Sequence, residues 1–206
     1  MNRPHATLAA APPAHDTVAM SQTDTLKSQL LIAMPSLEDP NFSRTVTYIC
    51  EHNDQGAMGI VLNRPTDLSL SDVLRHMDIE GGLGDAGEQI VYLGGPVEEE
   101  RGFVLHSHSP PWDSTLAVND AISVTTSRDI LEAMARGDGP AHTLVALGYA
   151  GWGAGQLERE MQENAWLSGP SDESILFELP PDQRWEAAAR LLGVDVNLLS
   201  SEAGHA

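Results

Sequence analysis

Residues 45–62 read TVTYICEHNDQGAMGIVL. Residues 45–50 are mostly β-branched or aromatic, a composition typical of a strand. Asn53, Asp54 and Gly56 favour a turn, and residues 57–62 form a second, mostly apolar run. Two such runs separated by a short turn predict a β-hairpin. The chain is therefore expected to contain antiparallel sheet.

Further strands and helices are expected on both sides of this hairpin. Ser69 and Asp72 indicate a capping box at the start of a short helix, while Gly137 and Gly193 are placed to end two other helices. Early hairpins followed by isolated helices predict a single α+β domain rather than a βαβ repeat. The expected strands cover residues 30–34, 90–93, 102–106, 122–125, 142–149 and 175–179, and the expected helices cover residues 69–77, 128–136, 156–165 and 181–192.

The chain has 206 residues, which is the size of one domain. Residues 1–25 are rich in Ala, Pro, Thr, Ser and Asp and lack apolar periodicity, so we expect a disordered N-terminal tail. The domain is expected over residues 26–195 and a flexible C-terminal tail over residues 196–206. Met1 and Met20 are both candidate translation starts, and the apolar stretch before Met20 is too short for a secretory signal.

Charge and cysteine content narrow the possible partners and compartments. The formal net charge is −19, Lys27 is the single lysine, and the arginines are scattered. Nucleic-acid binding draws its affinity from clustered cations, so direct binding to nucleic acid or to an anionic membrane is not expected. Cys50 is the single cysteine, which fits a cytoplasmic protein. No apolar run approaches the ~18 residues that a membrane-spanning helix needs.

Four ordered blocks of sequence, within residues 28–193, resemble the YqgE/AlgH family of bacterial proteins. The resemblance implies a mixed, strongly bent or partly closed β-sheet surrounded by helices. It implies no established activity, although some members are labelled transcriptional regulators. The blocks are LIAMP at 31–35 with Asp39, Pro40 and Phe42; CEH at 50–52 with GAMG at 56–59 and LNRP at 62–65; GGPV at 94–97 with RGFVLH at 101–106; and GYAGWGAGQLE at 148–158.

Residues 151–164 are the segment most suggestive of a site. A strand, a glycine-rich turn and a helix start resemble a phosphate-binding loop, but the spacing of known nucleotide motifs is absent. The alternative is that the glycines permit a sharp turn and close packing. In the expected helix, Gln156, Glu160 and Asn164 recur every four residues, so they either line a groove for a polar ligand or form a solvated face.

The leading hypothesis is a non-enzymatic binding or regulatory module that contacts an unidentified protein or small ligand. Arg64 and Arg101 offer rare positive charge, and Trp152 offers a rigid contact of the kind enriched in binding hot spots. We expect the candidate residues to gather largely around one groove. They are Asn63, Arg64, Gly94, Gly95, Pro96, Arg101, His106, Trp152, Gly153, Gln156, Glu160 and Asn164.

Two other function classes stay open. A hydrolase could use paired carboxylates or Cys50 with His52, which share one side of a strand that continues through them; the alternative is a buried, inert cysteine. A DNA-binding regulator is the third hypothesis. His106 and His108 fall short of a zinc ligand set, so neither a metal nor a cofactor is expected.

Overall fold

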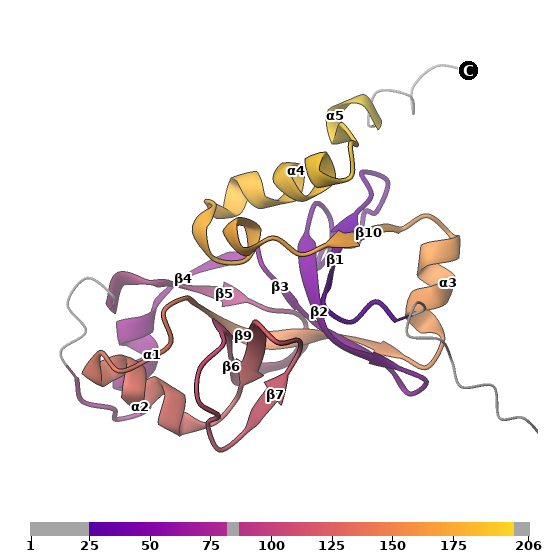
Figure 1. Ribbon diagram of the computed structural model, residues 1–206. Coiled ribbons are helices and arrows are strands. Elements are labelled where there is room, and N and C mark those ends of the chain that lie inside the picture. Colours follow the sequence, from indigo (N-terminus) through magenta and orange to yellow (C-terminus); the bar gives the residue numbers. More distant parts are fainter. Residues whose placement is uncertain (1–24, 82–86, 200–206) are drawn as a thin grey trace, which may run out of the picture.

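The computed structural model describes residues 25–81 and 87–199 (Figure 1). Within these residues, ten strands form one strongly curled, mainly antiparallel sheet, and helices pack around it. The strands are β1 (Gln29–Ala33), β2 (Val46–Asn53), β3 (Gly56–Val61), β4 (Pro65–Ser69), β5 (Ile90–Leu93), β6 (Val97–Ser107), β7 (Thr115–Ala117), β8 (Ile122–Thr125), β9 (Thr143–Gly153) and β10 (Trp166–Pro170). The helices are α1 (Leu70–His76), α2 (Arg128–Arg136), α3 (Gln156–Gln162), α4 (Pro181–Leu191) and α5 (Val196–Leu199), with a π-helical turn at Ser174–Glu178.

The sheet is organised around the long strand β9. The main path runs β10-β1-β2-β3-β9-β6-β8-β7, and β4 and β5 branch from it where β5 pairs with β9. Only the pairing of β5 with β9 is parallel among the described strands. The expected α+β domain with a strongly bent sheet is confirmed.

Residues 94–96 carry the chain across β9. Leu93 and Gly102 both pair with Leu147, so β5 and β6 lie on opposite edges of β9 and the chain must cross its backbone between them. A Cβ atom on Gly95 (φ +154°) would lie 2.1 Å from the carbonyl carbon of Tyr149. Glycine is required here because the two backbones touch.

Three apolar clusters fill the spaces between the sheet and the helices. The first lies under α4, where Trp185 donates its indole N–H to the Ala33 carbonyl (2.9 Å). The second lies under α1 and α2, and the third lies beside α3. Figure 1 shows α4 on one side of the sheet, α1 and α2 together at one end, and α3 at the far end.

Most predicted elements are present. The hairpin β2–β3 forms as expected, Ser69 and Asp72 form the capping box of α1, and Gly137 ends α2 with φ +82°. The prediction of a strand at residues 175–179 is wrong. The neighbours Ile175 and Leu176 are both buried, which a one-sided strand does not allow, and the chain forms the π-helical turn instead.

The short strands β4, β7 and β10 were not expected from the sequence, and the C-terminal boundary moves. Val196, placed in a flexible tail, begins α5 and is 3% exposed within the first cluster. The predicted tail at residues 1–25 lies outside the described residues except for its last one. No helix in the described part of the chain is long and apolar enough to span a membrane.

Candidate functional site

The predicted polar stripe on α3 forms contacts within the protein. Glu160 Oε2 accepts hydrogen bonds from the indole N–H groups of Trp152 (3.0 Å) and Trp166 (2.9 Å). Gln156 donates to Glu160 Oε1 (2.9 Å). Asn164 leaves the stripe, because α3 ends at Gln162 and Asn164 has φ +56°. The stripe therefore ties α3 to β9 and β10.

Trp152 is a core residue, and the expectation of an exposed aromatic contact there is wrong. Its residue exposure is 5%. Its ring packs against Phe42 (6.0 Å between centroids) and edge-on against Trp166 (5.9 Å). With Leu157, which is 1% exposed, these rings form the third cluster.

The glycine-rich segment does not form a phosphate loop. Gly151 and Gly153 lie in β9, where they pair with Met58 and Gly56 of β3. A Cβ on Gly56 would lie 2.1 Å from the Trp152 carbonyl oxygen. Gly155 has φ +68° at the start of α3, which fits the sharp turn considered as the alternative.

Asn63 and Arg64 hold a loop against the sheet. Asn63 accepts from the backbone N–H of Val46 (3.0 Å) and donates to the Arg44 carbonyl (2.9 Å). Arg64 donates to the carbonyls of Pro40 (3.2 Å) and Ser43 (2.9 Å). Both side chains satisfy backbone groups of residues 40–46.

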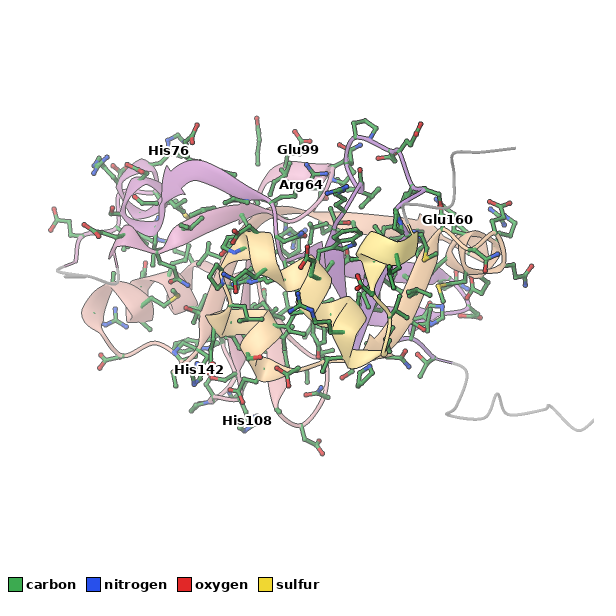
Figure 2. The ribbon with its side chains drawn as sticks, turned by 90° about the horizontal axis from the view of Figure 1, so that it is seen from above. Arg64, His76, Glu99, His108, His142 and Glu160 are labelled. Atoms are coloured by element: carbon green, nitrogen blue, oxygen red, sulfur yellow. The ribbon has the colours of Figure 1, made fainter. Side chains whose placement is uncertain are left out.

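His106 is 1% exposed, and its Nε2 hydrogen-bonds to the Thr125 hydroxyl (2.9 Å). Burial lowers the pKa of this imidazole below its ordinary value. Arg101 and Trp152 line one hollow, whereas Asn63 and Arg64 are bonded to the loop at residues 40–46 and Glu160 to two tryptophans. Figure 2 shows Arg64 and Glu160 on different parts of the molecule. The predicted site residues therefore do not gather around one groove.

The pair Cys50 and His52 is separated by a β-bulge between Ile49 and Glu51. Cys50 is fully buried in the first cluster, and burial raises the pKa of its thiol to about 12. His52 accepts from the backbone N–H of Leu26 (2.9 Å) and bonds Glu158 of α3 (2.7 Å). The expectation that both side chains share one side of the strand is wrong, and Cys50 is placed as an inert core residue.

Two hollows lie on opposite faces of β6. The concave groove, of about 780 Å³, is open and mixed in polarity, and Arg101 and Trp152 are among its lining residues. Arg101 lies over the Phe103 ring (5.5 Å) and is paired with Glu98 (3.0 Å). Its charge is thus already engaged within the protein.

The second hollow, here called the α1–α2 groove, has a volume of about 710 Å³ and a mainly apolar lining. Val104 on β6 and Val145 and Leu147 on β9 lie at its bottom. Of these, Leu147 is partly exposed, whereas Val104 and Val145 are 3% and 2% exposed. Its walls are apolar side chains of α1, of the residue that ends α1 and of α2, and its rim is polar apart from Leu68. The wall residues are Val73, Met77 and Leu131, and the rim includes Leu68, Asp72, His76, Glu99, Glu100 and Arg128.

Arg128 joins the two helices. Its guanidinium donates to the carbonyls of Met77 (2.7 Å) and Asp78 (3.3 Å) at the end of α1. It also pairs with Glu132 one turn along α2 (2.8 Å). The start of α2 is thereby bonded to the end of α1 at the rim of the groove.

Sequence reasoning did not identify the α1–α2 groove. A signal was present, because Val73 and Met77 form a second apolar stripe four residues apart beside the buried Leu70 and Leu74. What covers that stripe cannot be deduced from α1 alone. The structure leaves Val73 and Met77 half-buried at the wall of the groove.

Residues 30–197 match the model of a family described as AlgH-like. The chain belongs to the AlgH-like family. Relatives of this AlgH-like chain include a UPF0301 protein of Thioalkalivibrio sulfidiphilus, 63% identical over 91% of this chain and 100% of the relative. A UPF0301 protein of Methylococcus capsulatus is 55% identical over 90% of this chain and 98% of the relative.

Solved structures agree with the AlgH-like fold. The solution structure of the AlgH protein of Pseudomonas aeruginosa is 50% identical, with a TM-score of 0.74 over 91% of this chain and 100% of that chain. A crystal structure of a Corynebacterium diphtheriae protein, 20% identical with a TM-score of 0.69 over 88% of this chain and 95% of that one, shares the fold. Among the described residues of this AlgH-like chain, no three His, Cys, Asp or Glu side chains gather as a metal-ligand set.

Proposed function

We propose that this chain is a protein-binding module whose α1–α2 groove receives apolar side chains of a partner polypeptide. The observation that carries the proposal is an apolar hollow with a charged rim, at which Arg128 joins α1 and α2. Apolar surface that stays in water costs roughly 25 cal/mol per Å² relative to burial. A partner that covers the groove gains this free energy, and the charged rim keeps the free protein in solution.

The mouth of the groove extends the apolar surface outward. Leu68, at the mouth, is 43% exposed. Half-buried Val73, Met77 and Leu147 continue the same surface inward. A contiguous apolar patch with a polar rim is typical of an interaction site.

The other two function classes receive less support from the geometry. Cys50, with a pKa raised to about 12, is a poor nucleophile, and Glu160 is engaged by two indole N–H groups. For DNA binding, the chain would need a basic face, whereas the rim of the groove carries Glu99 and Glu100. A binding module fits these observations better than a hydrolase or a DNA-binding regulator.

The test uses the inertness of Cys50 to label an introduced cysteine selectively. Leu68→Cys, modified with a bulky maleimide, should block the groove and abolish the fluorescence enhancement of Nile red, an uncharged apolar dye. Leu191→Cys with the same label is the matched control, because Leu191 is 48% exposed and lies on α4, away from the groove.

A benzophenone maleimide at the same two positions tests for the partner. Illumination in a cell extract should give a discrete crosslinked product from position 68 that position 191 does not give. Nile red binding that survives the label at position 68, or identical products from both positions, would contradict the proposal.

A further inference from the structure

The shape of the α1–α2 groove bears on the secondary structure of what enters it. Both floor strands lie inside the sheet: β9 pairs with β3 and β5 on one edge and with β6 on the other, and β6 pairs with β9 and β8. A bound strand would need a free edge, and the floor offers none. The walls are two helices that lie on the same face of the sheet, so a third helix would complete that layer.

The lengths of the walls agree with a short helix. α1 has 7 residues and α2 has 9, which at ~1.5 Å per residue makes them ~10–14 Å long. Two to three helical turns of a partner span the same distance. Apolar side chains at i, i+4 and i+7 of such a helix all face one side and can enter the hollow together.

The rim adds a charge requirement. Glu99 and Glu100 are exposed, and neither carboxylate has an ion-pair partner among the described residues. The other charges at the rim are engaged, because Asp72 pairs with Arg75 (3.0 Å) and Arg128 pairs with Glu132. Figure 2 shows His76 and Glu99 along the same side of the molecule.

The net charge of −19 adds a long-range negative field to the local charge of Glu99 and Glu100. From the closed sheet floor, the two helical walls and the unpaired carboxylates, we infer that the partner segment is a basic amphipathic helix. Its apolar face lies against Leu68, Val73, Met77 and Leu147, which keep exposed surface. Its Lys or Arg side chains meet Glu99 and Glu100. This inference rests on the proposed function of the groove.

Three synthetic peptides of about 14 residues, long enough to form a helix on binding, test the inference by Nile red displacement. All three carry leucine at i, i+4 and i+7. One has lysine flanks, one has glutamate flanks, and one has lysine flanks with a central proline that breaks the helix. The lysine-flanked helical peptide should displace the dye most strongly, and its advantage should shrink with added salt.

The double variant Glu99→Gln with Glu100→Gln identifies the charged contact. Two exposed charge pairs correspond to a loss of roughly two- to thirtyfold in affinity for the lysine-flanked peptide. The control double variant, Glu163→Gln with Glu178→Gln, makes the same change in net charge at exposed positions outside the lining of the groove and should retain the affinity.

The outcomes separate this inference from the proposal beneath it. If the glutamate-flanked or the proline-containing peptide binds as well as the lysine-flanked helix, the basic helical partner is wrong. If Nile red binds in the groove but no peptide displaces it, the inference also fails while the apolar site stands. If neither dye nor peptide binds, the proposed function fails and the inference with it.

Discussion

The region around β9 and α3 and the groove between α1 and α2 differ in how their sequences relate to their roles. The first is rich in glycine and tryptophan, yet its notable residues are used for packing: Gly95 permits a backbone crossing and Glu160 joins two tryptophans. The second is built from ordinary Val, Leu and Met residues, yet it holds the apolar hollow. In this protein the conspicuous residues named here serve packing, and the candidate site is formed by common side chains that stay partly exposed, such as Val73, Met77 and Leu147.

The largest expected effect is on the backbone crossing. Gly95→Ala places a Cβ against Tyr149 at a φ of +154°, so we expect a loss of ~4 kcal/mol or more in the free energy of unfolding. Gly102→Ala is the control, because a Cβ there meets nothing within 4 Å. Urea denaturation would measure both variants. Equal stability of the two would show that the close approach to Tyr149 does not require glycine at position 95.

The next effect concerns Glu160. Glu160→Ala removes the acceptor of two indole N–H groups, and each unsatisfied buried donor costs ~1–3 kcal/mol. The loss should approach that of Leu157→Ala, for which ~2–5 kcal/mol is typical of a buried leucine.

Glu163→Ala, at an exposed position one residue beyond α3, should stay within about 0.5 kcal/mol of the wild type. Thermal denaturation followed by tryptophan fluorescence measures all three variants. If Glu160→Ala loses as little stability as Glu163→Ala, then the polar stripe of α3 is not needed for packing. The region around α3 would then be the better candidate for a binding surface.

A smaller effect should appear as a pH dependence. Burial raises the pKa of Cys50 from its ordinary 9.0 to about 12, so the folded state holds this proton more tightly than the unfolded state. The stabilisation is complete below about pH 9 and is lost as the pH rises toward 12. At about pH 10 the expected loss from this group is on the order of 1 kcal/mol.

Urea denaturation of wild type and Cys50→Ala at about pH 8 and about pH 10 isolates this contribution, because other groups titrate in both proteins. The wild type should lose more stability than the variant between the two pH values. Equal losses, or rapid thiol labelling of the native protein at neutral pH, would show an accessible thiol and favour the hydrolase hypothesis.

The smallest expected effect on stability concerns Arg128, which joins α1 and α2 beside the groove. Arg128→Ala removes the hydrogen bonds to Met77 and Asp78 and should cost ~1 kcal/mol, as partly exposed bonds usually do. Its effect on Nile red affinity should be larger than its effect on stability, since the spacing of α1 and α2 changes. Arg136→Ala, which removes a long, exposed contact with Asp138 (3.8 Å), should change neither quantity.

Short sequence patterns correctly predicted the turns and helix ends that depend only on neighbouring residues. The turn residues between β2 and β3, the capping box of Ser69 and Asp72 and the positive φ of Gly137 each depend on a few neighbouring residues. The strand predicted at residues 175–179 failed because Ile175 and Leu176 are buried together by packing, which no local rule contains. β10 was missed because its pairing with β1 spans more than a hundred residues.

The sequence by itself determined the α+β class, the acidic surface charge and the family, because composition and short motifs carry that information. Only the tertiary structure decided that Trp152 is buried, that Cys50 and His52 are separated by a bulge, and that Val104, Val145 and Leu147 lie at the bottom of a hollow. The physical reason is that exposure depends on which distant elements cover a side chain. In this protein α3, β9 and β10 cover Trp152 and Trp166, while Leu68, Val73, Met77 and Leu147 stay partly exposed around the α1–α2 groove.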